Sequence, residues 1–279
     1  MNTKIRLAIM MFLQFFIWGV FFVTMGTYLA KIFADEEGIN TIIGNAYATQ
    51  PWGALFAPLI VGYLGDRLMN KERLNGILQL MGAGLLWWVS TITDASMFFW
   101  ALLIFFICYM PTLALVNTIT FQNVDNIETD FPRIRIWGTI GWIAGGLVIS
   151  ESFFGLTALP ILPGIEEGGS TNIQFKIAAI ASVVYGLYSF SLPASPPEGK
   201  GESVDIIKLL GFDSLHLLKQ PAYFVFALCS FLICIPLAFY YARTGEFVGA
   251  MAFGNTTGGV MALGQVSEIL FMADRRAHV

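Results

Sequence analysis

The sequence predicts an all-α membrane protein, and three observations support this fold class. Of the 279 residues, 56% are hydrophobic and 12% are charged, whereas a soluble domain carries roughly 25% charged residues. The apolar residues gather in uncharged runs of about 20, the length that crosses a bilayer as a helix. Basic residues concentrate in alternate connections between the runs, which is typical of a chain that crosses a membrane repeatedly.

Eight membrane helices follow from these runs. Glu151 interrupts the fifth run, and polar residues interrupt the eighth. The first run follows a basic start, as in a signal peptide, but it is too long for a signal sequence and lacks a small-residue cleavage site, so we expect it to be retained. The expected helices cover residues 7–30, 41–64, 74–93, 95–122, 136–157, 173–193, 222–242 and 256–272.

The basic residues also predict the orientation of the chain. Twelve of the 15 Lys and Arg residues fall on one side if the first helix starts in the cytoplasm, and only Lys31, Lys176 and Arg243 fall on the other. Basic residues are retained on the cytoplasmic side of a membrane. We therefore expect a cytoplasmic N-terminus.

A Pro/Gly-rich stretch after the sixth helix predicts the domain division. We expect an N-terminal six-helix bundle over residues 1–193, a cytoplasmic linker over 194–221, and the start of a second bundle over 222–279. Within the linker, apolar and charged residues alternate over 206–219. This segment is either an amphipathic helix at the membrane interface or a loop packed under the bundle.

The last apolar run is too short to cross the membrane as a complete helix. It gives way to polar residues from Ala273 onward, where a crossing helix would need further apolar residues. We expect a second half that is truncated, by a frameshift, gene fragmentation or deliberate shortening. Because alternating access needs two bundles, such a chain is expected to transport little or nothing.

The connection between the second and third expected helices contains Gly62-Tyr-Leu-Gly-Asp66-Arg67. It resembles the loop signature of the major facilitator superfamily, in which glycines let helices approach and the Asp/Arg pair latches them. We expect Asp66 and Arg67 to form such a conformational latch. The match is partial, because this chain has Met69 where the family usually carries another glycine. An ordinary basic cytoplasmic loop is the alternative.

Three separated motifs carry a more specific resemblance. They begin Tyr109-Met-Pro-Thr, Thr129-Asp-Phe-Pro-Arg-Ile-Arg-Ile-Trp-Gly-Thr and Gly264-Gln-Val-Ser-Glu. Together they resemble the bacterial nucleoside:proton symporter family of the major facilitator superfamily. The resemblance covers nearly the whole chain, from Phe12-Leu-Gln-Phe15 and Trp18-Gly19 to Phe271.

This resemblance implies a major facilitator-type bundle that takes up nucleosides with protons by alternating access. It implies a location in the bacterial cytoplasmic membrane, no enzymatic activity, no cofactor, and a monomer. The partners would be a nucleoside, a proton and the lipid bilayer. A carrier for another small polar solute and a non-transporting fragment are the alternatives.

Arg135, Thr139 and Trp142 lie at helical spacing on one face of the fifth expected helix. A positive charge, a hydroxyl and an aromatic plane suit a polar ligand with a flat ring, so Arg135 and Thr139 are expected to bind ribose hydroxyls and Trp142 to stack on a base. The resemblance implies substrate contacts at the same positions. Alternatively, Arg135 extends to the membrane interface and Trp142 only packs within the bundle.

Glu268 lies within the last apolar run, with Gln265 one turn before it. Carboxylates inside a membrane are costly and usually serve a pathway or a proton relay. We expect both residues to bind substrate and Glu268 to take up the coupled proton. The alternative is an interfacial salt bridge between Glu268 and Arg275 or Arg276.

Other residues give weaker signals. Tyr240 and Tyr241 stand where related transporters tend to carry amides facing the substrate, which favours a different solute, or else they belong to an outer aromatic belt. Several polar residues either line a cavity or bond between helices, and four glycines predict close helix contacts. These are Gln14, Thr24, Thr27, Gln50, Asn117 and Thr118, and Gly138, Gly141, Gly145 and Gly146.

Enzyme, metal and nucleic-acid functions find no support in the sequence. It contains no His-Glu-x-x-His, Gly-x-Ser-x-Gly or phosphate-loop motif, and both histidines, His216 and His278, lie outside the expected helices. Cys108, Cys229 and Cys234 lie in apolar runs, where thiols behave as small hydrophobic groups. A formal net charge of -4 argues against nucleic-acid binding.

Overall fold

The computed structural model describes residues 2–150, 152–153, 156–157, 168–198, 212–251 and 257–274. Eight helices of 17 residues or more lie in these ranges and match the eight expected segments. They are α1 (Thr3–Phe22), α3 (Ile39–Ile60), α4 (Lys71–Val89), α5 (Ala95–Gln122), α6 (Ile127–Val148), α7 (Ile173–Ser189), α9 (Pro221–Ala250) and α10 (Thr257–Asp274).

Shorter elements join the long helices. They are α2 (Met25–Ile32), a π-helix (Val61–Leu68), 3-10 helices (Gly168–Ser170 and Phe212–Lys219), and the two-residue strands β1 (Ser152–Phe153) and β2 (Leu156–Thr157), which pair antiparallel. The linker segment expected as an amphipathic helix is therefore 3-10 over Phe212–Lys219. Residues 206–211 of that expectation lie outside the described ranges.

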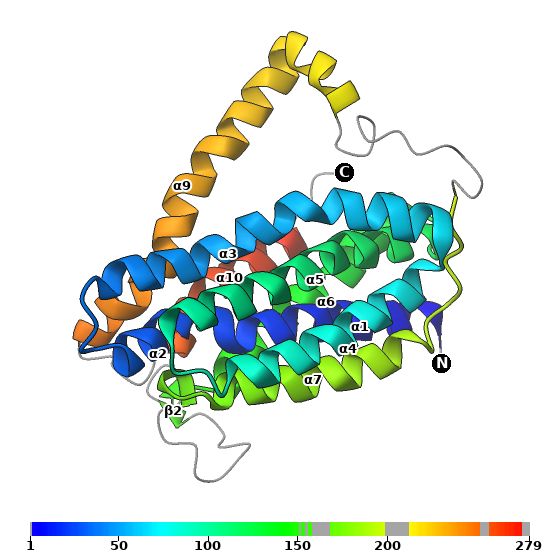
Figure 1. Ribbon diagram of the computed structural model, residues 1–279. Coiled ribbons are helices and arrows are strands. Elements are labelled where there is room, and N and C mark those ends of the chain that lie inside the picture. The colour runs from blue at the N-terminus through cyan, green and yellow to red at the C-terminus, as the bar shows by residue number, and fades with distance from the viewer. Residues whose placement is uncertain are drawn as a thin grey trace.

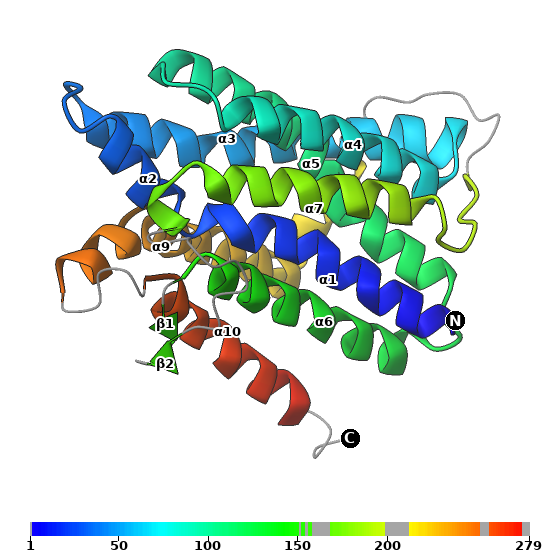
Figure 2. The same cartoon turned by 90° about the horizontal axis from the view of Figure 1, so that it is seen from below.

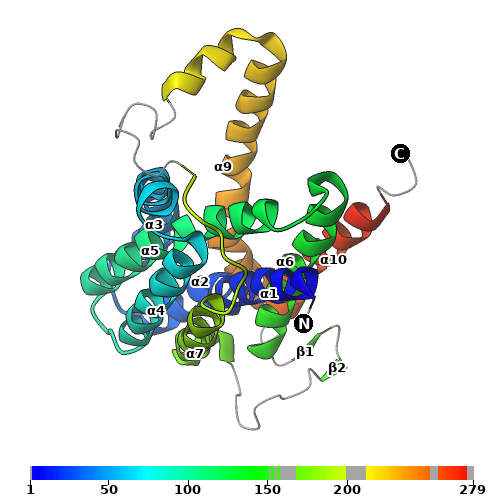
Figure 3. The ribbon, with the colours of Figure 1, turned by 90° about the vertical axis from the view of Figure 1, so that its right-hand side faces the viewer.

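The long helices run side by side in one bundle, apart from α9 (Figure 1). α1 lies between α6 and α7, and α10 lies along α6 (Figure 2). α4 packs against α5 and α7, and α3 packs against α5. α9 touches the bundle near its C-terminal end and otherwise rises away from it (Figure 3).

Three stretches of the described helices are long and apolar enough to cross a membrane. They are Thr3–Ile32, Ala95–Gln122 and Pro221–Val248. The other long helices are shorter or less apolar, because they carry more polar residues and glycines. Among them, Ile173–Ser189 is apolar but has only 17 residues.

The first expected helix is broken, which the apolar run over 7–30 did not indicate. α1 ends at Phe22 and α2 begins at Met25. The Tyr47 hydroxyl bridges the break, because it donates to the Phe22 carbonyl oxygen over 3.0 Å and accepts from the Gly26 amide over 3.1 Å. Tyr47 therefore pairs two backbone groups that a broken helix leaves without partners.

The expected bounds of the fifth helix, 136–157, are wrong at both ends. α6 begins at Ile127 and ends at Val148. Its start is fixed by Asn126, whose side-chain oxygen accepts a hydrogen bond from the Thr129 amide over 3.2 Å. This N-cap and a polar first turn extend the helix beyond its apolar run, so hydropathy alone places its start too late.

Glycines join α1 to α6 at close range, as expected. A Cβ on Gly145 would lie 2.7 Å from the Phe16 carbonyl oxygen, and one on Gly141 would collide with the Phe12 carbonyl oxygen. From the opposite side, a Cβ on Gly19 would lie 2.6 Å from the Trp142 carbonyl oxygen. The predicted close contacts are confirmed at Gly141 and Gly145, because no larger residue lets the two backbones come this near.

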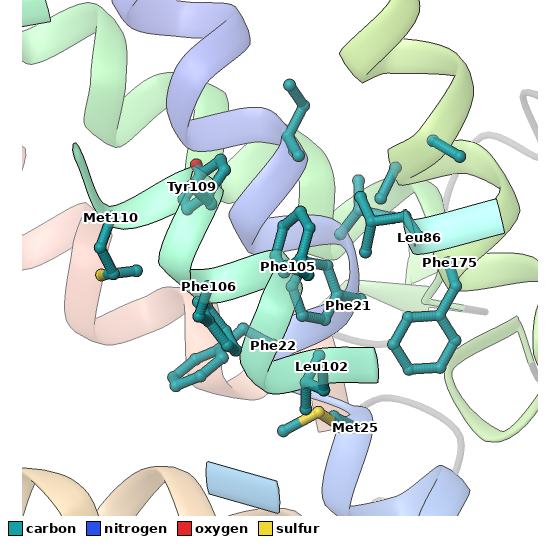
Figure 4. Packing of buried hydrophobic residues seen from close by; sticks show 14 of the residues in the cluster. Phe21, Phe22, Met25, Leu86, Leu102, Phe105, Phe106, Tyr109, Met110 and Phe175 are labelled. Carbon is teal, nitrogen blue, oxygen red and sulfur yellow. The ribbon is translucent and has the colours of Figure 1, made fainter. Parts of the chain in front are cut away.

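Aromatic rings fill the core between α1, α5 and α7 (Figure 4). Phe21 lies 5.7 Å from Phe105 and 5.5 Å from Phe175, measured between ring centroids. Phe105 stacks on Tyr109 at 5.3 Å. These edge and stacked contacts add to ordinary packing and hold the three helices together.

Buried hydrogen bonds cross the same core. Gln14 donates to Thr112 over 2.7 Å, Gln79 donates to Gln14 over 3.1 Å, and Ser182 donates to Gln79 over 3.4 Å. This network links α1, α4, α5 and α7. Gln14 thus bonds between helices, and so does Thr24, which donates to Gln174 over 2.9 Å.

Candidate functional site

One cavity of about 770 Å³ lies between α1, α3, α6, α9 and α10. All five residues expected to contact substrate line it, although they come from segments more than 120 positions apart in the sequence. The described residues that line it are Phe15, Trp18, Phe22, Gly44, Tyr47, Ala48, Gln50, Pro51, Arg135, Thr139, Trp142, Cys234, Ile235, Leu237, Ala238, Phe239, Tyr241, Ala242, Gln265 and Glu268.

α6 contributes Arg135, Thr139 and Trp142, one turn apart on one face. The Arg135 guanidinium carbon lies 4.1 Å from the centroid of the Phe15 ring, a cation–π distance. Its Nη1 atom is buried and has no hydrogen-bond partner. The Arg135 guanidinium therefore forms part of the cavity lining and does not extend to the membrane interface.

α10 contributes Gln265 and Glu268, one turn apart, and it packs along α6. The Gln265 Oε1 atom is buried without a hydrogen-bond partner. The Glu268 carboxylate is exposed to the cavity and interacts electrostatically with Arg135. Arg275 and Arg276, its alternative partners, lie outside the described residues.

Aromatic rings form much of the remaining wall, beside small and aliphatic residues of α3 and α9, and sequence reasoning missed most of these rings. Trp142 lies 5.2 Å from Trp18 and 5.9 Å from Tyr241, between ring centroids. Phe22 lies 5.2 Å from Tyr241. The spacing of Phe15, Trp18 and Phe22 along α1 is helical, so an aromatic stripe on this helix was the available signal.

The two tyrosines of α9 have different surroundings. Tyr241 lines the cavity beside Trp142. Tyr240 turns toward α10, where its hydroxyl donates to the Met261 carbonyl oxygen over 3.5 Å. Only Tyr241 is therefore placed to touch a ligand in this cavity.

The chemistry of the lining limits what the cavity suits. Among the described residues that line it, Arg135 and Glu268 are the two charged ones, and their charges cancel. Aromatic rings line several sides of the cavity, and hydrogen-bond donors and acceptors lie between these rings. A flat, uncharged ligand with hydroxyl or carbonyl groups fits this combination. Within the described part of the chain, no three His, Cys, Asp or Glu side chains group as metal ligands.

Asp66 and Arg67, expected in a loop, lie in the π-helix Val61–Leu68 and belong to a separate cluster at the start of α4. Asp66 Oδ1 lies 3.4 Å from the fully buried Lys71 Nζ. The Lys71 amide donates to the Ser195 carbonyl oxygen over 2.9 Å, and Glu72 accepts from the Ser195 amide over 2.9 Å. Lys71 and Glu72 thus fasten the segment after α7 to α4, a contact that sequence reasoning missed. The latch role of Asp66 and Arg67 stays a prediction.

Comparisons with known proteins are consistent with this arrangement. A family model described as nucleoside H+ symporter matches residues 1–274. The chain is 40% identical over 273 residues to "Putative nucleoside transporter YegT" and 30% identical over 285 residues to "Nucleoside permease NupG", both of Escherichia coli (strain K12). These matches cover 98% of this chain but 61% and 64% of the relatives.

A solved structure is similar as well. The crystal structure of nucleoside transporter NupG (D323A mutant) superposes with a TM-score of 0.81 at 30% identity, over 98% of this chain and 67% of that one. This likeness confirms the predicted major facilitator-type helical bundle.

Proposed function

The chain belongs to the nucleoside H+ symporter family, and from this premise we propose that it binds nucleosides in the cavity, from which the complete protein carries them across the membrane with protons. The chain is a multi-pass membrane protein and not an enzyme. One observation carries the proposal: Arg135, Thr139, Trp142, Gln265 and Glu268 line a single cavity whose charges cancel. A neutral nucleoside needs such a site.

The cavity offers a partner for each part of a nucleoside. The base stacks on Trp142, with Tyr241 as a second ring 5.9 Å away. The ribose hydroxyls accept from Arg135 and Thr139 and donate to Gln265 or Glu268. Arg135 and Gln265 each carry a buried polar atom without a protein partner, and such atoms gain most when a ligand pairs them.

Glu268 is the proposed proton acceptor. It is the one carboxylate among the described residues that line the cavity, and a single proton on it changes the net charge of the site by one. Because Arg135 interacts with it electrostatically, protonation of Glu268 weakens that attraction and leaves the Arg135 guanidinium available to the ligand. Proton uptake and nucleoside binding are then coupled through one pair of residues.

The remaining features of the proposal concern the whole protein. The chain spans 61% of the length of one relative and 64% of another, so transport by alternating access is proposed for the complete protein. We assign residues 1–193 to one six-helix bundle, 194–221 to a cytoplasmic linker and 222–279 to the start of a second bundle. The distribution of basic residues supports a cytoplasmic N-terminus in a bacterial cytoplasmic membrane, and we propose a monomer.

Equilibrium binding of labelled uridine to the purified chain tests the proposal. We expect saturable binding that unlabelled nucleosides displace and that uridine monophosphate, which carries two further negative charges near neutral pH, displaces at least tenfold less well. Arg135→Ala is expected to weaken binding, whereas Arg73→Ala, in the first turn of α4, serves as the matched control. Absence of uridine binding by folded chain contradicts the proposal.

The same preparation tests proton coupling. We expect uridine binding to take up protons from a weakly buffered solution in the native chain but not in Glu268→Gln. A native-like proton signal in Glu268→Gln would remove Glu268 from the coupling role while leaving nucleoside binding untouched.

A carrier of another polar solute is the second candidate, because Tyr241 stands in the cavity where related transporters tend to carry amides. Competition against a labelled uncharged aromatic solute separates the two. Saturable binding of that solute, with no displacement by any nucleoside, favours the second candidate.

A further inference from the structure

The cavity holds more unpaired hydrogen-bonding atoms than any other part of the described chain. Six buried side-chain polar atoms among the described residues lack a hydrogen-bond partner, and three of them belong to residues that line this cavity. They are Trp18 Nε1, Arg135 Nη1 and Gln265 Oε1. Buried polar atoms in proteins are nearly always paired, so this concentration points to the cavity as a ligand-binding site.

Trp18 is the member of this group that sequence reasoning did not select. Its ring is held by Trp142 at 5.2 Å, Phe22 at 5.4 Å and Tyr109 at 6.0 Å, between centroids. Three helices, α1, α5 and α6, therefore fix the position of the indole. Since the ring is held from several sides, its N–H has little freedom to turn toward another acceptor.

Packing alone does not explain a tryptophan here. A phenylalanine fills much of the same space and makes similar edge contacts, and it buries no unpaired donor. An indole N–H in a cavity wall lowers stability in the empty protein, because burial removes its bond to water. This cost is offset when a ligand in the cavity accepts a hydrogen bond from the indole N–H.

We infer that Trp18 is a specificity-determining residue whose indole N–H donates a hydrogen bond to an acceptor oxygen of the bound nucleoside. The inference rests on the proposed function and deepens it. Nucleosides carry such oxygens on both the base and the ribose. A site built to pair a substrate atom discriminates strongly against analogues without that atom, because its own polar group is then left unpaired.

The experiment removes the N–H while keeping the ring. Uridine affinity is measured for the native chain, for Trp18→Phe, and for a chain with benzothienylalanine inserted site-specifically at position 18, which has the shape of tryptophan without the N–H. We expect both changes to weaken binding about three- to tenfold, the effect of one lost hydrogen bond. Trp100→Phe, at a position 57% exposed on α5, is the matched control and should bind as the native chain does.

An analogue series identifies the acceptor. Uridine derivatives that each lack one acceptor oxygen, at the 2′, 3′ or 5′ position of the ribose or the 2 or 4 position of the base, are compared across the variants. We expect one of them to bind the native chain more weakly by the same factor and to lose nothing further in Trp18→Phe, as in a double-mutant cycle.

The possible results separate this inference from the proposed function. If the benzothienylalanine chain binds uridine as tightly as the native chain, Trp18 is not a donor, and the proposed function stands. The inference also fails if every analogue keeps its full penalty in Trp18→Phe. If the folded native chain binds no nucleoside, both proposals are overturned.

Discussion

α5 and α9 are both long, strongly apolar helices, yet they differ completely in burial. Of the residues in the most apolar 18-residue segment of each helix, 61% are buried in α5 and 0% are buried in α9. α5 packs against α3 and α4 within the bundle, whereas most of α9 stands clear of it (Figure 3). Apolar character therefore identifies both as membrane helices but does not decide which one packs against protein, because lipid solvates apolar side chains equally well.

The difference lies in small and polar residues. α5 meets Gly53 of α3, where a Cβ would lie 2.6 Å from the Phe106 carbonyl carbon, and its Thr112 accepts hydrogen bonds from α1 and α4. Within the part of the chain that the structure describes, the exposed part of α9 forms no hydrogen bond with another helix. Its polar contacts begin near Tyr240 and Arg243, which donates to Asn40 over 2.6 Å. Close approach and polar contacts, rather than hydropathy, hold this bundle together.

The largest effect is expected from a core ring of α5. Phe105 is fully buried, and Phe105→Ala should lower the free energy of unfolding by about 3 kcal/mol, at the low end for such changes because detergent tails solvate the ring in the unfolded chain. Unfolding in mixed micelles measures it. A loss below 1 kcal/mol would mean that α5 is not packed as described.

The close contact of α3 with α5 gives the next effect. Gly53→Ala adds a methyl group against the Phe106 backbone and should cost about 1–3 kcal/mol by overpacking. Gly44→Ala, on the same helix with open space around its Cβ, is the matched control. Equal stability of the two variants would contradict the close approach.

The buried polar network gives a smaller effect. Gln79→Leu keeps the side-chain volume and removes the hydrogen bonds with Gln14, Thr112 and Ser182, at a cost of about 0.6–2 kcal/mol, as for hydrogen bonds between membrane helices. The same micelle unfolding assay measures the loss. A stabilised variant would show that the network costs more than it contributes.

The smallest effect is expected on α9. Phe231 is 67% exposed, and Phe231→Ala should change stability by less than about 0.5 kcal/mol, as exposed substitutions usually do. It is the direct counterpart of Phe105→Ala. A cost that rivals the Phe105 variant would mean that α9 packs on the bundle in solution and would erase the contrast between the two helices.

The sequence predicted the helices better than their details. Apolar runs were sufficient to find all eight long helices, and the helical spacing of Arg135, Thr139 and Trp142 was sufficient to put them on one face. The break after Phe22 was not predicted, because apolar residues continue across it and because the Tyr47 hydroxyl that bridges it comes from another helix. Trp18 was not predicted as a site residue, because its N–H is left without a partner only when three helices enclose the ring.

Photochemical labelling tests the central claim, that the cavity bearing Arg135 and Glu268 receives a nucleoside. The purified chain is irradiated with 5-iodouridine, and the labelled peptides are mapped by mass spectrometry. We predict that adducts fall on aromatic residues of the cavity, foremost Trp142, and that excess uridine suppresses them. Labelling confined to exposed rings such as Trp100, or adducts at Trp142 that excess uridine leaves unchanged, would contradict the claim.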